Sequence, residues 1–143
     1  MSTPGARVAD TIVAMHQRRQ IGEGSYRAAI AYRAAFDRLA RSKESTIVGT
    51  IDAPASRRYL EAQEKHMTAT AVVNLVHRLL GPLDTSILID VVGCNFTIEE
   101  ATRRCLTAGE PPSAADREHV GRRLRVALEI LARNATFREL LSG

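Results

Sequence analysis

The chain of 143 residues contains no tryptophan, and aromatic residues make up only 4% of it. Runs of β-branched residues and glycine-containing hairpin turns, which are typical of strands, are also scarce. Hydrophobic residues nevertheless reach 45%, so a core can be built from aliphatic side chains. These features predict an all-α fold of about six helices.

Cysteine is scarce as well, since only Cys94 and Cys105 are present, at a spacing that matches neither a metal site nor a redox motif. The histidines His16, His66 and His77 are scattered and form no paired ligand motif. We therefore expect reduced thiols, no metal and no cofactor.

The sequence also lacks the usual signatures of a catalytic site. It has no glycine-rich phosphate loop and no Ser, His and Asp in a catalytic order. Glu99 and Glu100 are adjacent carboxylates, but neither has a histidine near it in the sequence. We expect that the protein is not an enzyme.

No signal peptide is evident, and no uninterrupted apolar run approaches the roughly 18 residues that cross a bilayer. We therefore expect a cytoplasmic protein without a membrane partner. The formal net charge of +4 favours an acidic partner such as nucleic acid. The basic excess lies in residues 1–80, with 12 Lys and Arg against 7 Asp and Glu, whereas residues 81–143 hold 8 against 9.

Apolar periodicity divides the chain into an N-terminal helical region, residues 1–80, and a helix-turn-helix region, residues 81–143, which we expect to share one core. Residues 1–6 are small and polar and are expected to be disordered. A first helix should run from Val8 to near Gln20.

The second helix should begin at Glu23 or Ser25 and present an apolar stripe to the core and a charged face to solvent. The stripe comprises Ala28, Tyr32, Ala35, Phe36 and Leu39, and the charged face comprises Arg33, Asp37 and Arg41.

A connector over residues 42–53 should lead to a long third helix, with Asp52 as its N-cap and Pro54 in its first turn. The helix should end at Leu80, before the Gly81-Pro82 break. Its first half should be solvated, and its predicted core face comprises Leu60, Met67, Val72, Leu75, Val76, Leu79 and Leu80.

Two short helices are expected after the break. Asp84 should cap an apolar helix that ends at Gly93, and Thr97 with Glu100 matches the capping box of a helix that runs through Leu106.

A turn-rich loop over residues 107–112 should precede a final helix, which Ser113 and Asp116 open as a weaker capping box. This helix should run to about Arg133 or beyond, and we interpret Gly121 within it as a mark of close backbone approach. Its predicted buried residues are Val120, Leu124, Ala127, Leu128 and Leu131.

The final helix is cationic in its first half and apolar in its second half. In a helix-turn-helix, two helices hold the last one so that its N-terminal turns enter the major groove. The predicted base-contacting residues are Arg117, His119, Arg122, Arg123 and Arg125. The alternative is a solvated face with ion pairs at i,i+4 spacing, namely Glu118 with Arg122, Arg125 with Glu129, and Glu129 with Arg133.

Other arginines could contact the DNA backbone, or they could simply form a solubilising surface. This set comprises Arg18, Arg19, Arg27, Arg33, Arg38, Arg41, Arg103 and Arg104.

The segments LDTSILIDVVGCNFTIEEATRR and HVGRRLRVALEILAR resemble the C-terminal DNA-binding region of sigma factors. Four segments in order, YRAAIAYRAAFDRL, LLGPLDTSILIDVV, FTIEEATRR and RRLRVALEILAR, are more similar to an alphaproteobacterial domain of unknown function. That domain occurs in helix-turn-helix regulators and in activators of gene transfer agents, and the resemblance covers roughly residues 8–135. The chain departs from it at Ala115-Asp116, where the family has Trp-Pro, at Gly121, where it has Lys, and in a longer preceding loop.

The resemblance implies a DNA-binding transcriptional regulator that activates phage-like, gene transfer agent genes, with double-stranded DNA as its partner. The alternative is a protein-interaction module that contacts RNA polymerase or another transcription factor without base readout, as the near-neutral C-terminal half suggests. Formation of a homodimer remains open.

Overall fold

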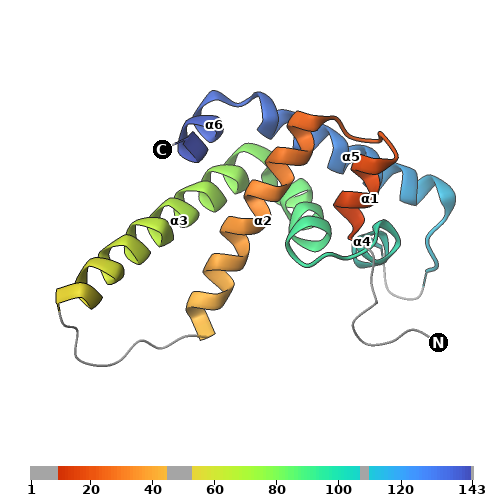
Figure 1. Ribbon diagram of the computed structural model, residues 1–143. Coiled ribbons are helices and arrows are strands. Elements are labelled where there is room, and N and C mark those ends of the chain that lie inside the picture. The colour runs from red at the N-terminus through yellow and green to blue at the C-terminus, as the bar shows by residue number, and fades with distance from the viewer. Residues whose placement is uncertain (1–9, 45–52, 107–109, 143) are drawn as a thin grey trace.

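The computed structural model describes residues 10–44, 53–106 and 110–142 (Figure 1). Within these ranges the fold is all-α, as predicted, with six α-helices, one π-helical turn and no strand. The predictions for residues 1–6, for Val8 as the start of a helix and for Asp52 as an N-cap lie outside the described residues.

Helix α1 (Thr11–Gln17) begins after Asp10, whose carboxylate accepts hydrogen bonds from the N–H groups of Ile12 and Val13. The helix is shorter than predicted because the chain turns at Arg19, where φ is 60°. Helix α2 (Glu23–Glu44) follows this turn.

Helix α3 (Ala53–Leu88) is bent at Gly81, where φ is 80° and ψ is 172°, a conformation that glycine adopts without strain. The predicted break is confirmed, but the helix resumes at Pro82 and ends in the π-helical turn η2 (Ile89–Gly93). Asp84 therefore does not cap a new helix as predicted. Its carboxylate accepts a hydrogen bond from Arg123 Nε at 2.7 Å.

Helices α4 (Ile98–Cys105) and α5 (Ala114–Arg133) lie where the sequence predicted them, and both begin with the predicted capping box. A further helix, α6 (Ala135–Ser142), was not separated from α5 in the sequence. Asn134 divides the two, since its Oδ1 accepts a hydrogen bond from the N–H of Phe137.

Helix α2 packs against both α3 and α5, α6 packs on α3, α1 packs on α2 and η2, and α4 packs on α5 (Figure 1). One hydrophobic cluster draws on both halves of the chain. Its fully buried members include Tyr32 and Val76 from the first half, and Leu88, Leu128 and Phe137 from the second.

Three side chains predicted for the core of α3 are exposed instead: Leu60 by 59%, Met67 by 68% and Leu79 by 37%. Val72 and Val76 are buried as predicted. The prediction was wrong for Leu60 and Met67 because they lie about one half-turn around the helix from the buried face.

By length and composition alone, the segment Gln63–Gly93 could cross a membrane. A core helix meets the same criterion, and Val72, Val76, Leu88 and Val91 of this segment are buried inside the molecule.

Candidate nucleic-acid interface

Helix α4 is fixed by its first turn and by an ion pair between the exposed Arg104 and the buried Asp90. Thr97 Oγ1 accepts a hydrogen bond from the N–H of Glu100 at 3.1 Å, and the Glu100 carboxylate accepts one from the N–H of Thr97 at 2.8 Å. Arg104 Nε donates to Asp90 at 3.0 Å, and its guanidinium lies 5.5 Å from the centre of the Phe96 ring. Arg104 thus anchors α4, although 61% of its side chain is exposed.

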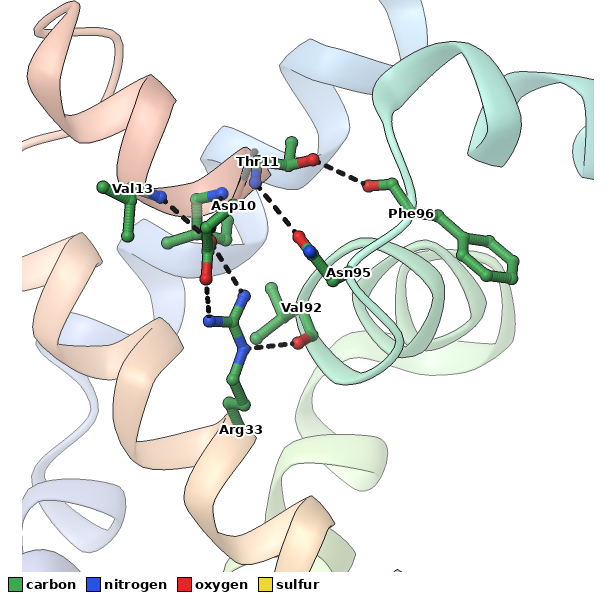
Figure 2. Close-up of polar contacts among 8 residues, drawn as sticks. Asp10, Thr11, Val13, Arg33, Val92, Asn95 and Phe96 are labelled. Atoms are coloured by element: carbon green, nitrogen blue, oxygen red, sulfur yellow. Dashed lines mark hydrogen bonds and ion pairs between the residues drawn. The ribbon is translucent and has the colours of Figure 1, made fainter. Parts of the chain in front are cut away.

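A second polar cluster joins α1, α2 and η2, as Figure 2 shows. Arg33 donates hydrogen bonds to both carboxylate oxygens of Asp10 and, through Nε, to the carbonyl of Val92 at 2.9 Å. Burial raises the pKa of Asp10, but the hydrogen bonds from Arg33 and from the N–H of Val13 outweigh it, so the pKa lies below its ordinary value.

This cluster corrects the prediction that Arg33 lies on a solvated face or contacts the DNA backbone. Its side chain is only 20% exposed and is committed to Asp10. The ion pair joins residues 23 positions apart, which helical periodicity within α2 does not reveal.

The turn between η2 and α4 is held by the start of α1 (Figure 2). The N–H of Thr11 donates to Asn95 Oδ1 at 3.0 Å, and its hydroxyl donates to the carbonyl of Phe96 at 3.1 Å. Asn95 adopts a φ of 56°, a left-handed conformation that asparagine tolerates better than most residues. Thr11, at the start of α1, therefore fixes the turn that precedes α4.

The first turn of α5 is closed by reciprocal hydrogen bonds between Ser113 and Asp116, of 3.0 and 3.1 Å. The hydrogen bonds from Ser113 lower the pKa of Asp116 below its ordinary value. All five side chains predicted to be buried along α5 are buried: Val120, Leu124, Ala127, Leu128 and Leu131.

His119 and Arg122 are the two predicted base-contacting residues that lie exposed on α5, and 66% of the Arg122 side chain is accessible. Ala114, Ala115 and Glu118 are also exposed on this first half of the helix. Their spacing of four and three residues places Ala115, Glu118, His119 and Arg122 on one side of α5. We call these four residues the outer face of α5.

Arg117 and Arg123 are directed away from this face toward neighbouring elements. Arg117 donates to the carbonyl of Pro112 at 3.1 Å and lies 3.6 Å from the Glu99 carboxylate on α4. Arg123 is paired with Asp84 of α3. The five predicted residues therefore do not form a single surface.

The Glu118 carboxylate forms ion pairs with two arginines of α5. Arg122 lies 3.5 Å and Arg125 lies 3.2 Å from the same carboxylate oxygen. Glu118–Arg122 is one of the three ion pairs that the sequence offered as the alternative to DNA contact. Among the described residues, the other two expected pairs, Arg125–Glu129 and Glu129–Arg133, do not form.

Gly121 is not a site of close backbone approach, which corrects that interpretation. A Cβ atom at this position would meet only the end of the Arg125 side chain, at 3.4 Å.

The remaining arginines are distributed over several elements. Arg27 and Arg41 are exposed on α2 but lie about 21 Å apart along it, so they do not form one patch. Arg38 is half-buried on the same helix. Arg103 is exposed on α4 and is paired with Glu99 at 3.1 Å.

Cys94 and Cys105 are free thiols, and desolvation raises the pKa of each. In the described part of the chain, no group of three or more His, Cys, Asp or Glu side chains is placed to hold a metal ion.

Sequence reasoning missed the carboxylates that orient this region. Asp10 could have been predicted as a helix N-cap, because it immediately precedes an apolar segment with helical spacing. Asp84 was predicted only as a helix cap and Asp90 was not predicted at all, since their partners Arg123 and Arg104 lie 39 and 14 positions away.

No protein-family model, curated protein or solved structure matches this chain.

Proposed function

We propose that this chain is a DNA-binding transcriptional regulator that inserts the first turns of α5 into the major groove. The division of α5 carries the proposal, because no residue of its capped first turns, from Ala114 to His119, is buried, whereas from Val120 to Leu131 one face of the helix is buried in the core. A recognition helix needs this division, since its first turns must reach base edges while the rest holds the helix at a fixed angle. The resemblance to gene transfer agent regulators extends the proposal to an activator of phage-like genes, acting in the cytoplasm.

The elements before α5 support the proposal. A helical segment ending at Gly93, the short turn 94–97 and α4 precede α5 in the order of a helix-turn-helix. The connection from α4 to α5, residues 106–113, is longer than the usual three or four residues. Contacts of α5 with α2, α3 and α4 must therefore set its angle.

Arg117 and Arg123 supply the polar part of those contacts. Arg117 reaches Glu99 of α4, and Arg123 reaches Asp84 of α3, so the two arginines hold α5 from two sides. We assign them as positioning residues, and we assign base contact to the outer face of α5.

The outer face offers several modes of readout. An arginine such as Arg122 donates two hydrogen bonds to guanine, and a carboxylate such as Glu118 accepts one from the amino group of cytosine. Ala115 has a short side chain that permits close approach and can contact a thymine methyl group. Phosphates would compete with Glu118 for Arg122 and Arg125, so binding should weaken steeply as the salt concentration rises.

The proposal is tested by selecting bound fragments from fragmented genomic DNA and measuring their affinity by fluorescence anisotropy at several salt concentrations. Arg122→Ala should weaken binding by about 1–3 kcal/mol if the residue reads a base. Arg138→Ala is the matched control, because it removes the same charge from an exposed position on α6. Absence of binding by folded protein at low salt, or equal loss in both variants, would contradict the proposal.

A second candidate function is direct contact with RNA polymerase or another transcription factor. Two observations favour it: each of the four arginines of α5 from Arg117 to Arg125 already has a carboxylate partner, and Val126 and Ile130 are 48% and 41% exposed on the same helix. Exposed apolar side chains with a polar surround are typical of protein interfaces.

The two candidates are separated by binding to purified RNA polymerase in the absence of DNA. If the second candidate is right, the chain should bind polymerase without DNA, and Val126→Asp should abolish that binding while Arg122→Ala leaves it unchanged. If α5 reads DNA, Arg122→Ala should weaken DNA binding while Val126→Asp leaves it unchanged.

A further inference from the structure

The two most exposed large hydrophobic side chains among the described residues, Leu60 and Met67, both lie on α3. They are seven residues apart, so they share one face of the helix, opposite the buried Ala69 and Val76. Figure 1 shows that the first half of α3 extends past α6, with α2 beside it. Nothing in the described chain covers this face.

The same face continues along α3 into an open groove of about 760 Å³. Ala71, Asn74 and Arg78 of α3 line the groove, and Thr136 and Leu140 of α6 form its other wall. An exposed apolar strip that runs into a groove is typical of a surface that receives a helix.

The face is complementary to a second copy of itself in antiparallel orientation. Residues equally far on either side of Ala71 would then lie opposite one another. Met67 would meet Leu75 of the other copy, and Glu64 would meet Arg78. The small side chain of Ala71 at the centre would let the two helices approach closely.

The charges support this pairing. Glu64 and Arg78 are exposed, and neither takes part in an ion pair within the described part of the chain. They lie about 21 Å apart on one helix, too far to pair with each other. An antiparallel copy would supply each with an opposite charge, at both ends of the interface, as a two-fold contact requires.

We propose that the chain forms a two-fold homodimer through α3, with the face from Leu60 to Arg78 packed against the same face of a second copy and α6 flanking the contact. This inference does not depend on DNA binding, and it is tested without DNA.

The test is sedimentation equilibrium of the full chain over a wide range of concentrations. The unmodified protein should dimerise, and Met67→Lys should raise the dimer dissociation constant by about tenfold or more, because an unpaired ammonium group would be buried. Ile30→Lys is the control, because it makes the same kind of change at an exposed apolar position of α2. Circular dichroism of each variant checks that its helical content is unchanged.

A charge exchange tests the orientation. Glu64→Arg and Arg78→Glu should each weaken the dimer by repulsion across the interface, and the double variant should restore it. A protein that stays monomeric at all concentrations, or single variants whose defects are not rescued, would overturn the proposal. Monomers that sediment with phosphatidylglycerol vesicles would overturn it too and would assign the face to a lipid surface.

Discussion

Glu118 lies between two arginines of the proposed recognition helix, and its carboxylate decides how much positive charge that helix offers to DNA. Arg122 and Arg125 share one of its oxygens, both within 3.5 Å. Exposed pairs of this kind contribute little to folding, typically about 0.2–1 kcal/mol. Removing the carboxylate should therefore change binding more than stability.

Glu118→Gln keeps the size of the side chain and removes its charge. We expect tighter binding to DNA of unrelated sequence and a steeper salt dependence, because two arginines become available to phosphates. Anisotropy titrations of random duplexes at several salt concentrations measure both quantities. Glu129→Gln, which removes an exposed carboxylate that holds no arginine within the described residues, is the control. If both variants bind DNA with equal affinity, Arg122 and Arg125 do not contact the phosphates.

Two glycines illustrate how the same substitution can have opposite effects. A Cβ at Gly93 would lie 3.0 Å from two ring atoms of Phe36, so Gly93→Ala should destabilise the fold by about 1–3 kcal/mol. Gly121 lies inside α5 with only the end of Arg125 nearby, so Gly121→Ala should stabilise by up to about 1 kcal/mol. Urea unfolding measures both changes. Phe36→Leu should reduce the cost of Gly93→Ala, and a cost that is independent of Phe36 would contradict the steric explanation.

At the scale of elements, Asp10 joins the start of α1 to α2 and, through Arg33, to η2. Its carboxylate caps α1 and holds Arg33, which also reaches the carbonyl of Val92. Asp10→Asn keeps a capping oxygen but loses the charge, so it should cost roughly 1–2 kcal/mol of the free energy of unfolding.

The lowered pKa of Asp10 gives this prediction a pH dependence. The unfolded chain binds the proton more readily than the folded one, so the contribution of Asp10 is present above the ordinary pKa of 3.8 and is lost as the pH falls through the lowered value. The difference in unfolding free energy between the parent and Asp10→Asn should accordingly shrink in acid. A difference that stays constant from neutral pH to pH values well below 3.8 would show that the charge is not what matters.

The elements that could be predicted from sequence are those whose signals are local. The capping boxes at Thr97 and Ser113, the break at Gly81 and the buried side chains of α5 each depend on neighbouring residues or helical spacing. The core face of α3 was predicted only in part, because apolar residues such as Met67 occur on both sides of the helix and periodicity alone cannot show which side α2 covers.

The candidate site was predicted less completely than the fold. The sequence located the helix and its exposed Arg122 and His119, but it grouped them with Arg117 and Arg123. What separates these residues is their pairing with Glu99 and Asp84, which depends on how α4 and α3 pack against α5. Such contacts between distant segments carry no periodic signal in the sequence.

At the scale of the whole molecule, the proposed DNA-binding region is not an independent domain. Leu124, Leu128 and Phe137 belong to the same hydrophobic cluster as Tyr32 and Val76 of the first half. A fragment cut at the Gly81 break would therefore expose a large apolar surface and lose the partners that hold α5.

We expect fragment 81–143 to lack cooperative thermal unfolding and to bind DNA no better than an unfolded peptide of the same composition, because residues 81–143 bury too little apolar surface on their own. The full chain should unfold in a single transition, since one cluster joins both halves. Adding fragment 1–80 should restore helical signal and the transition, as measured by circular dichroism. A C-terminal fragment that melts cooperatively by itself would mean that the buried contacts of α2 with α5 contribute little, and that the recognition helix can be positioned by α4 alone.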